Sequence, residues 1–155
     1  MKSKFIKAHL EVARVYGQLS SANRLKVGCI IAHYDRIISI GYNGMPSGAS
    51  NVCEQDGKTK PEVLHAEANA ILKLAKSPES SEGASMFTTY APCFDCAKLI
   101  MQSGIYDLHY EYSYKNQDGI NLLKSYWPNY TNRIYKHGDE LDRFADEQMQ
   151  LPFSY

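Results

Sequence analysis

The sequence lacks an excess of charge of either sign, a long apolar run and a large set of cysteines. Its 155 residues carry 17 basic and 17 acidic side chains, so the formal net charge is zero. Domains that bind nucleic acid chiefly through its phosphates carry a clear basic excess, so we expect no nucleic-acid partner. A small anionic ligand needs only one or two local cations and remains possible. Apolar runs such as residues 27–33 are too short to span a bilayer, so we expect no membrane partner.

Four cysteines are too few to stabilise a chain of this length by disulfides. The N-terminal segment MKSKFIKAHLEV has charges that interrupt its apolar residues, which a signal peptide does not. These two features predict a cytoplasmic protein. Hydrophobic residues at 44% and charged residues at 22% are typical of a folded chain that buries one core.

Apolar periodicity predicts a series of helices and strands in which the two types alternate after an opening hairpin. Such an order predicts an α/β fold, a three-layer α/β/α sandwich with a mixed sheet of about five strands. Residues 1–155 would form one domain, with a core at about 5–115 that carries the candidate functional residues and a tail, 116–155, packed on it. Residues 43–61 read as a long polar loop without secondary structure of its own, which favours a functional role. We expect helices over 5–19, 65–76, 93–103, 120–126 and 140–149, and strands over 25–32, 36–42, 84–90, 106–112 and 133–136.

Two short motifs, His65-Ala66-Glu67 and Pro92-Cys93-Phe94-Asp95-Cys96, each lie at the start of a predicted helix. One imidazole and two thiolates make three zinc ligands and leave the fourth position open for water, as in catalytic zinc sites. A helix N-terminus also favours the thiolate form of cysteine. His-x-Glu followed by Pro-Cys-x-x-Cys is the established signature of zinc deaminases, in which the glutamate moves protons and is not a ligand. The motifs therefore predict hydrolytic deamination, with Glu67 as general acid and base.

Three other interpretations of these residues remain open. A lone Cys-x-x-Cys pair can be redox active, although this would leave His65 and Glu67 unexplained. A structural zinc site would need a fourth protein ligand, for which Cys53 is the best candidate. A zinc-stabilised binding module without enzymatic activity would have no use for Glu67.

The segments GYNGMP (residues 41–46), HAEANAI (65–71) and APCFDCAKLI (91–100) resemble the deoxycytidylate (dCMP) deaminase family of the cytidine-deaminase-like superfamily. The resemblance extends from about Leu10 to Tyr114. It implies the fold of that superfamily and the zinc-dependent conversion of dCMP to dUMP and ammonia, a step towards dTMP. A deaminase of dCTP, of cytidine or another small heterocycle, or of nucleic acid would use the same zinc site, so these alternatives stay open.

The resemblance also implies roles for residues at matching positions. His65, Cys93 and Cys96 would bind zinc. Asn43 would contact the sugar 3′-hydroxyl, the Ala66 amide the pyrimidine O2, and the Ala91 carbonyl the exocyclic amine. The residues implied for the 5′-phosphate are Ser20, Arg24 and Tyr114, with Lys26 and Lys115 nearby.

Regulation and assembly follow from the resemblance as well. The family is typically a homohexamer that dCTP activates and dTTP inhibits, and the triphosphate carries Mg²⁺. The allosteric residues would be Gly41, Tyr42, Gly44, Met45 and Pro46. Some members hold a second, structural zinc, but residues 20–23 (SSAN) supply no cysteine here, so we expect one zinc per chain.

Overall fold

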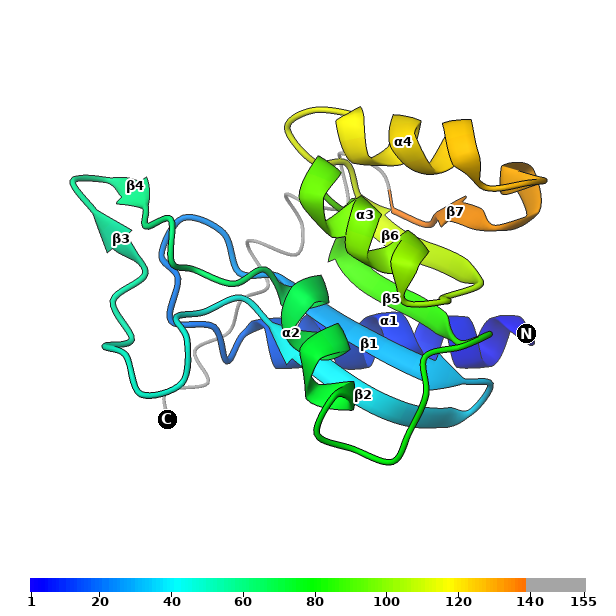
Figure 1. The fold of residues 1–155 in the computed structure, drawn as a ribbon, viewed down its shortest axis with the longest axis horizontal. Coiled ribbons are helices and arrows are strands. Elements are labelled where there is room, and N and C mark those ends of the chain that lie inside the picture. The colour runs from blue at the N-terminus through cyan, green and yellow to red at the C-terminus, as the bar shows by residue number, and fades with distance from the viewer. Residues whose placement is uncertain (139–155) are drawn as a thin grey trace.

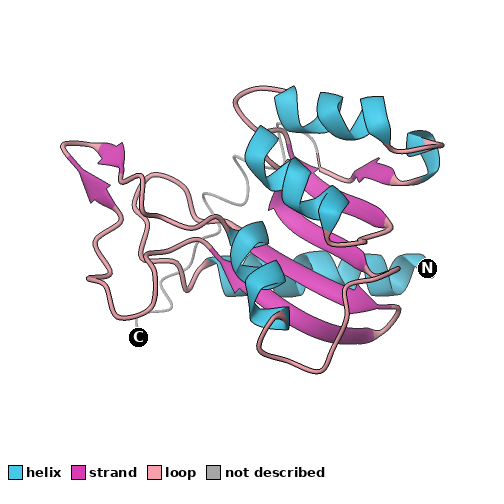
Figure 2. Ribbon diagram, viewed as in Figure 1, coloured by secondary structure: helices cyan, strands magenta, loops and turns pink. Residues whose placement is uncertain are grey.

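The computed structural model describes residues 1–138, which build a five-stranded sheet with helices on both faces (Figures 1 and 2). The sheet is mixed, because β1 is antiparallel to both of its neighbours while β5, β6 and β7 are parallel to one another. In spatial order the strands are β2 (Arg36–Tyr42), β1 (Gly28–His33), β5 (Ser85–Tyr90), β6 (Asp107–Tyr112) and β7 (Ile134–Lys136).

Helices cover the sheet as the predicted three-layer α/β/α architecture requires. Helix α1 (Ser3–Gly17) packs on one face of the sheet. On the other face lie α2 (Ala66–Leu74) and α3 (Phe94–Gln102), and α4 (Asp118–Tyr126) packs against α3. A 3₁₀ turn (Tyr130–Asn132) leads into β7. The fold prediction is therefore confirmed for this part of the chain.

The core has two halves because alternate side chains of a strand point to opposite faces. On β1, Ile30 and Ala32 pack towards α1, whereas Cys29 and Ile31 pack towards α2 and α3. The half beside α1 also contains Leu10, Ala13 and Phe87, and the other half contains Ala70, Met86, Ile100 and Leu108.

Two glycines let helices lie directly against the sheet. A Cβ atom on Gly28 would overlap the carbonyl oxygen of Ala13 in α1. A Cβ atom on Gly41 would overlap the carbonyl oxygen of Ala66 in α2. Because only glycine permits these approaches, Gly41 fixes the start of α2 relative to β2.

The predicted elements and the observed ones agree apart from their ends, with one correction. Residues 43–61 are not without secondary structure, because β3 (Glu54–Gln55) and β4 (Lys58–Thr59) form a hairpin there that projects from the sheet (Figure 1). Its turn residues Asp56 and Gly57 both have positive φ, as an Asp-Gly hairpin turn requires.

The described part of the tail packs on the core, with α4 against α3 and β7 paired to β6. The helix expected near 140–149 lies outside the described residues. In residues 1–138, none of the helices has the length and apolar character that crossing a membrane demands.

Candidate metal centre and substrate cavity

Three potential metal ligands meet where α2 and α3 begin. His65 is the N-cap of α2, Cys93 is the N-cap of α3, and Cys96 lies in the first turn of α3. The Nδ1 atom of His65 lies 3.4 Å from Cys93 Sγ and 3.5 Å from Cys96 Sγ. The two helices lie on the same face of the sheet, so residues 28 and 31 positions apart in the sequence come into contact.

The spacing of these atoms suits zinc. A tetrahedral site with Zn–N of about 2.0 Å and Zn–S of about 2.3 Å places nitrogen and sulfur about 3.5 Å apart, close to both observed distances. The three donor atoms lie within 4.8 Å of one another, and one imidazole with two thiols leaves a fourth position for water. Within residues 1–138, no second group of three His, Cys, Asp or Glu side chains converges in this way.

The surroundings of Cys93 lower the pKa of its thiol. A hydrogen bond with the Cys96 side chain lowers the pKa of the Cys93 thiol to about 4, and His65 contributes to the same shift. The backbone N–H of Cys96 also donates to Cys93 Sγ at 3.5 Å. The same hydrogen bond with the Cys93 side chain, together with burial, raises the pKa of Cys96. These opposite shifts favour the thiolate form on Cys93 over Cys96.

The carboxyl group of Glu67 lies beside this cluster and is almost completely buried, with 4% of the residue exposed. Burial raises the pKa of Glu67 to about 7, against smaller opposing effects of a backbone hydrogen bond, of His65 and of a hydrogen bond with Cys96. A carboxyl group with a pKa near neutrality can both accept and release a proton, which general acid–base chemistry requires.

Two of the potential ligands, His65 and Cys93, line an inner cavity of about 90 Å³. Backbone groups form part of its wall. Ala66 is the first residue of α2, where N–H groups have no acceptor within the helix. The Ala91 N–H donates to the Tyr112 carbonyl at 2.8 Å, which holds this end of β5 against β6. The residues that line the cavity include Asn43, His65, Ala66, Glu67, Ala91 and Cys93.

Asn43 lines the same cavity and also joins two segments of the chain. Its Oδ1 accepts the N–H of Val27 at 2.8 Å, and its Nδ2 donates to the Leu25 carbonyl at 2.8 Å. These bonds attach the segment before β1 to the end of β2. One Nδ2 hydrogen and one Oδ1 lone pair stay available for a ligand.

A wider outer cleft of about 850 Å³ continues from the inner cavity, and the two share Leu25, Tyr90 and Tyr114 among other residues. Arg24, Lys58 and Lys115 contribute three cations to the lining of this cleft. The lining contains no carboxylate side chain among the residues that the structure describes. The outer cleft is therefore an anion-attracting extension of the inner cavity.

Only some of the residues expected to contact a phosphate line the outer cleft. Arg24, Tyr114 and Lys115 line it together. Ser20 lines neither cavity. Its hydroxyl donates to the Asn43 carbonyl at 2.7 Å and accepts the Ala22 N–H at 3.1 Å.

Lys26 also lines neither the inner cavity nor the outer cleft. Its Nζ lies 3.5 Å from the Gln18 carbonyl oxygen instead.

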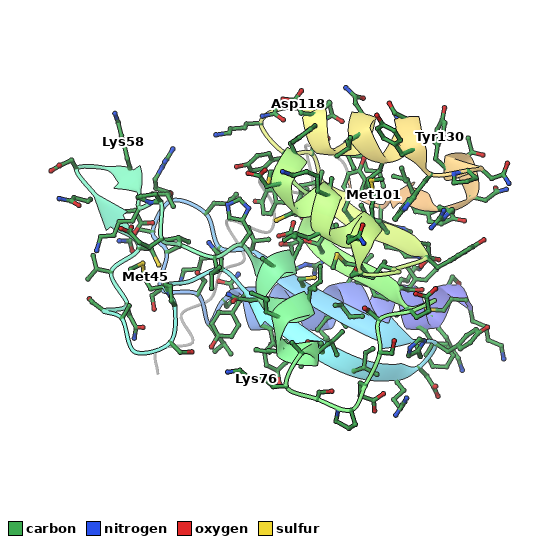
Figure 3. All side chains as sticks on the ribbon, in the orientation of Figure 1. Met45, Lys58, Lys76, Met101, Asp118 and Tyr130 are labelled. Carbon is green, nitrogen blue, oxygen red and sulfur yellow. The ribbon has the colours of Figure 1, made fainter. Side chains whose placement is uncertain are left out.

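Sequence reasoning missed the hairpin residues at the outer cleft. Lys58 lines the cleft, and Glu54 Oε1 accepts the backbone N–H groups of Asn23 and Arg24 at 2.7 and 3.1 Å. Figure 3 shows Lys58 on the projecting hairpin. The Asp-Gly pair at 56–57 is the signal that could have predicted this hairpin, but it could not have shown where Lys58 lies.

The residues expected to take part in regulation surround the connection from β2 to α2. Gly41 lies under α2, and the carbonyl of Tyr42 accepts a hydrogen bond from Asn69 of α2 at 2.8 Å. Gly44 pairs with Leu64, the residue before His65. Met45, labelled in Figure 3, and Pro46 follow on the loop that carries the hairpin.

Comparison with known proteins agrees with this geometry. The family model for the cytidine and deoxycytidylate deaminase zinc-binding region matches residues 2–112. Deoxycytidylate deaminase of Enterobacteria phage T4 is 35% identical over 153 aligned residues, which cover 71% of this chain and 79% of the phage protein. The human deoxycytidylate deaminase is 41% identical over 105 residues, which cover 62% of this chain and 58% of the human protein.

A solved structure is similar over most of its length. The crystal structure of dCMP deaminase from the cyanophage S-TIM5, in complex with dCMP and dUMP, has a TM-score of 0.83 and 40% sequence identity. The match covers 88% of this chain and 99% of the phage chain. With its His, Cys and Cys side chains gathered beside a buried glutamate, the chain belongs to the cytidine and deoxycytidylate deaminase family of zinc-binding hydrolases.

Proposed function

We propose that the protein hydrolyses dCMP to dUMP and ammonia, a reaction of pyrimidine deoxynucleotide synthesis that supplies the precursor of dTMP. One observation carries the proposal. The buried Glu67 carboxyl group lies beside a three-ligand metal cluster in an inner cavity that continues into a cationic cleft. The phage relatives, named as deaminases of dCMP or deoxycytidylate, support this substrate.

One Zn²⁺ ion per chain would be held by His65 Nδ1 and by the Sγ atoms of Cys93 and Cys96. In a site with three protein ligands, zinc supplies a water whose pKa is lowered towards neutrality. Cys53 takes no part in this set, because it lies outside the His65, Cys93 and Cys96 cluster and its Sγ contacts the Asn51 carbonyl at 3.6 Å.

Glu67 moves the protons of the reaction. Its carboxylate takes a proton from the water that attacks C4 of the cytosine ring and passes this proton to N3. It then takes the second proton of the water and delivers it to the departing amine, so that water and dCMP become dUMP and ammonia. A pKa raised by burial suits both transfers, since neither protonation state of Glu67 is strongly disfavoured.

The walls of the inner cavity hold the nucleoside. The N–H of Ala66 donates to the pyrimidine O2, and the carbonyl of Ala91 accepts from the exocyclic amine. The free Nδ2 hydrogen of Asn43 donates to the 3′-hydroxyl. Hydrogen bonds to the backbone of Leu25 and Val27 hold the Asn43 side chain in place before the ligand binds. Little side-chain entropy is therefore lost on binding.

The outer cleft holds the 5′-phosphate through Arg24, Tyr114 and Lys115. Arg24 supplies a forked donor that matches phosphate geometry, which a lysine does not. Ser20 contributes indirectly in this arrangement, since its hydroxyl supports the backbone of Asn43.

We further propose that the protein works in the cytoplasm as a homohexamer, activated by dCTP and inhibited by dTTP, each bound with Mg²⁺. Its four cysteines are free thiols, as a reducing compartment would keep them. Tyr106, Tyr126 and Tyr130 expose large aromatic surfaces of the kind enriched at protein interfaces. The triphosphate site would include Gly41, Tyr42, Gly44, Met45 and Pro46.

Ammonia release from dCMP, dCTP, deoxycytidine, cytosine and a short oligonucleotide, measured side by side, tests the function. We expect the highest kcat/KM for dCMP. A clear preference for the nucleoside, the free base or the oligonucleotide would reject dCMP as the substrate. The conclusion that the protein is a zinc deaminase would still hold. No ammonia from any of them, with one zinc bound per chain, would reject deamination of cytosine rings altogether.

A further inference from the structure

We propose that Lys58, on the β3–β4 hairpin, binds the 5′-phosphate and helps the site to prefer a nucleoside monophosphate over the unphosphorylated nucleoside. This inference rests on the proposed function and adds to it a residue from a part of the chain outside the catalytic motifs. Lys58, labelled in Figure 3, is the first residue of β4. With Arg24 and Lys115, it is one of three cations that line the outer cleft.

The three cations lack carboxylate partners among the residues that the structure describes. Elsewhere in the described chain, Arg36 pairs with Glu79 at 2.8 Å and Lys98 pairs with Asp95 at 2.9 Å. By contrast, no ion pair is formed by the side chains of Arg24, Lys58 or Lys115 within residues 1–138, and Lys115 Nζ instead lies 5.6 Å from the centre of the Tyr114 ring. Three like charges around one cleft repel one another. An anion bound between them is attracted to all three and offsets this repulsion, so its binding is stabilised.

A phosphate monoester has the charge that this cleft requires. It carries about −1.5 to −2 at neutral pH and has several acceptor oxygens. Arg24 and Lys115 alone would balance that charge only if both were fully engaged, and both side chains are exposed and partly screened by water. Lys58 adds a third positive charge from the hairpin side of the cleft.

The position of Lys58 relative to Arg24 is constrained by the chain itself. Glu54, in the strand paired with β4, accepts the N–H groups of Asn23 and Arg24. The Lys60 N–H donates to the Cys53 carbonyl at 2.8 Å and closes the base of the hairpin. The hairpin and the Arg24 segment are therefore one connected unit, which places Lys58 and Arg24 around the same cleft.

The experiment compares Lys58→Ala, Lys58→Arg and Lys60→Ala in the full chain with zinc bound. Lys60 is the matched control, because it lies two residues away on the same hairpin but lines neither the inner cavity nor the outer cleft. The measured quantity is the ratio of kcat/KM for dCMP to kcat/KM for deoxycytidine. We expect Lys58→Ala to lower this ratio about fivefold through KM, as loss of one exposed ion pair does. Lys58→Arg should restore most of it, and Lys60→Ala should keep the wild-type ratio.

Ionic strength provides a second readout, since salt screens exposed charges. The KM for dCMP should rise with salt in the wild type and less steeply in Lys58→Ala. If Lys58→Ala keeps the wild-type ratio of kcat/KM for dCMP to that for deoxycytidine, the proposal is overturned. If Lys58→Ala and Lys60→Ala lower this ratio equally, the effect is one of general charge, and the proposal is overturned as well. A wild-type enzyme that does not prefer dCMP over deoxycytidine would instead reject the proposed substrate, a result that is visible before any variant is made.

Discussion

Gly44 and Leu64 exchange two backbone hydrogen bonds, with N···O distances of 3.0 and 2.8 Å, and so close the loop that contains the β3–β4 hairpin. Gly44 follows Asn43, and Leu64 precedes His65, so one bridge connects the proposed contact to the sugar with the proposed metal ligand. A ligand that moves Gly44 would therefore change the position of His65 through a single residue pair. Such a bridge is a physical route for the proposed regulation by triphosphates.

We predict that Gly44→Ala keeps the fold but weakens the response to dCTP and dTTP. Nothing lies within 4 Å of the position of the new Cβ, so the unfolding midpoint should stay near that of the wild type. A site built from main-chain amides needs close approach, which a methyl group obstructs. Coupling of this kind is typically worth about 1–3 kcal/mol. The check is dCMP kinetics with each triphosphate and Mg²⁺, with sedimentation to determine the size of the oligomer. Wild-type kinetics unchanged by either nucleotide, or a monomer at all concentrations, would contradict the proposal.

Glu67→Gln should keep its zinc and its fold but lose turnover. The amide has nearly the shape of the buried carboxyl group but cannot accept or release a proton. Loss of a positioned general acid and base costs about 10²- to 10⁴-fold in rate. Metal analysis, thermal unfolding and ammonia release on the same sample check this. Activity near the wild-type level would remove Glu67 from the mechanism.

Cys96→Ala should lose both zinc and activity, because two remaining protein ligands rarely hold catalytic zinc. Cys53→Ala is the control, since Cys53 is also a buried thiol but lies outside the ligand cluster. We expect one zinc per chain in the Cys53→Ala variant and in the wild type. Two zinc ions in the wild type, or normal zinc affinity in Cys96→Ala, would show that the ligand set is wrong.

Arg24→Ala should reduce the preference for dCMP over deoxycytidine. A charge-assisted hydrogen bond to phosphate contributes about 1.5–3 kcal/mol, which corresponds to about a 10- to 150-fold change in relative kcat/KM. Lys26→Ala serves as the comparison, because Lys26 points to the Gln18 carbonyl and lines neither cavity. Equal changes in the two variants would reject a specific role for Arg24.

Gly28→Ala should destabilise the protein by at least about 2 kcal/mol, because its Cβ would overlap the backbone of α1 and the helix would have to move. The midpoint of urea unfolding measures this, and Gly44→Ala, where the Cβ meets open space, provides the reference. Similar midpoints for the two variants would show that α1 does not lie as close to β1 as the structure has it.

Much of the fold and the chemistry could be read from local sequence patterns. Alternating and helical periodicities predicted the strands and helices because each depends on which side of a short segment is buried. The two zinc motifs were recognisable because metal chemistry demands particular residue types at fixed short spacing, and both occur at helix starts. The β3–β4 hairpin was missed, because its strands have two residues each and carry no apolar pattern.

Contacts between distant segments were decided only by the tertiary structure. The packing of α2 beside α3 made Nδ1 of His65, and not Nε2, the atom that faces both sulfurs. The burial of Glu67, which raises its pKa, depends on the whole core around it. Among the basic residues, Arg24 and Lys58 line the outer cleft, whereas the Lys26 side chain lies against the Gln18 carbonyl. The direction of each side chain depends on how its loop packs against other segments, which the sequence does not show. Spacing along a chain specifies chemistry within one turn of helix, whereas the distance between residues 30 positions apart is set by the packing of the elements that carry them.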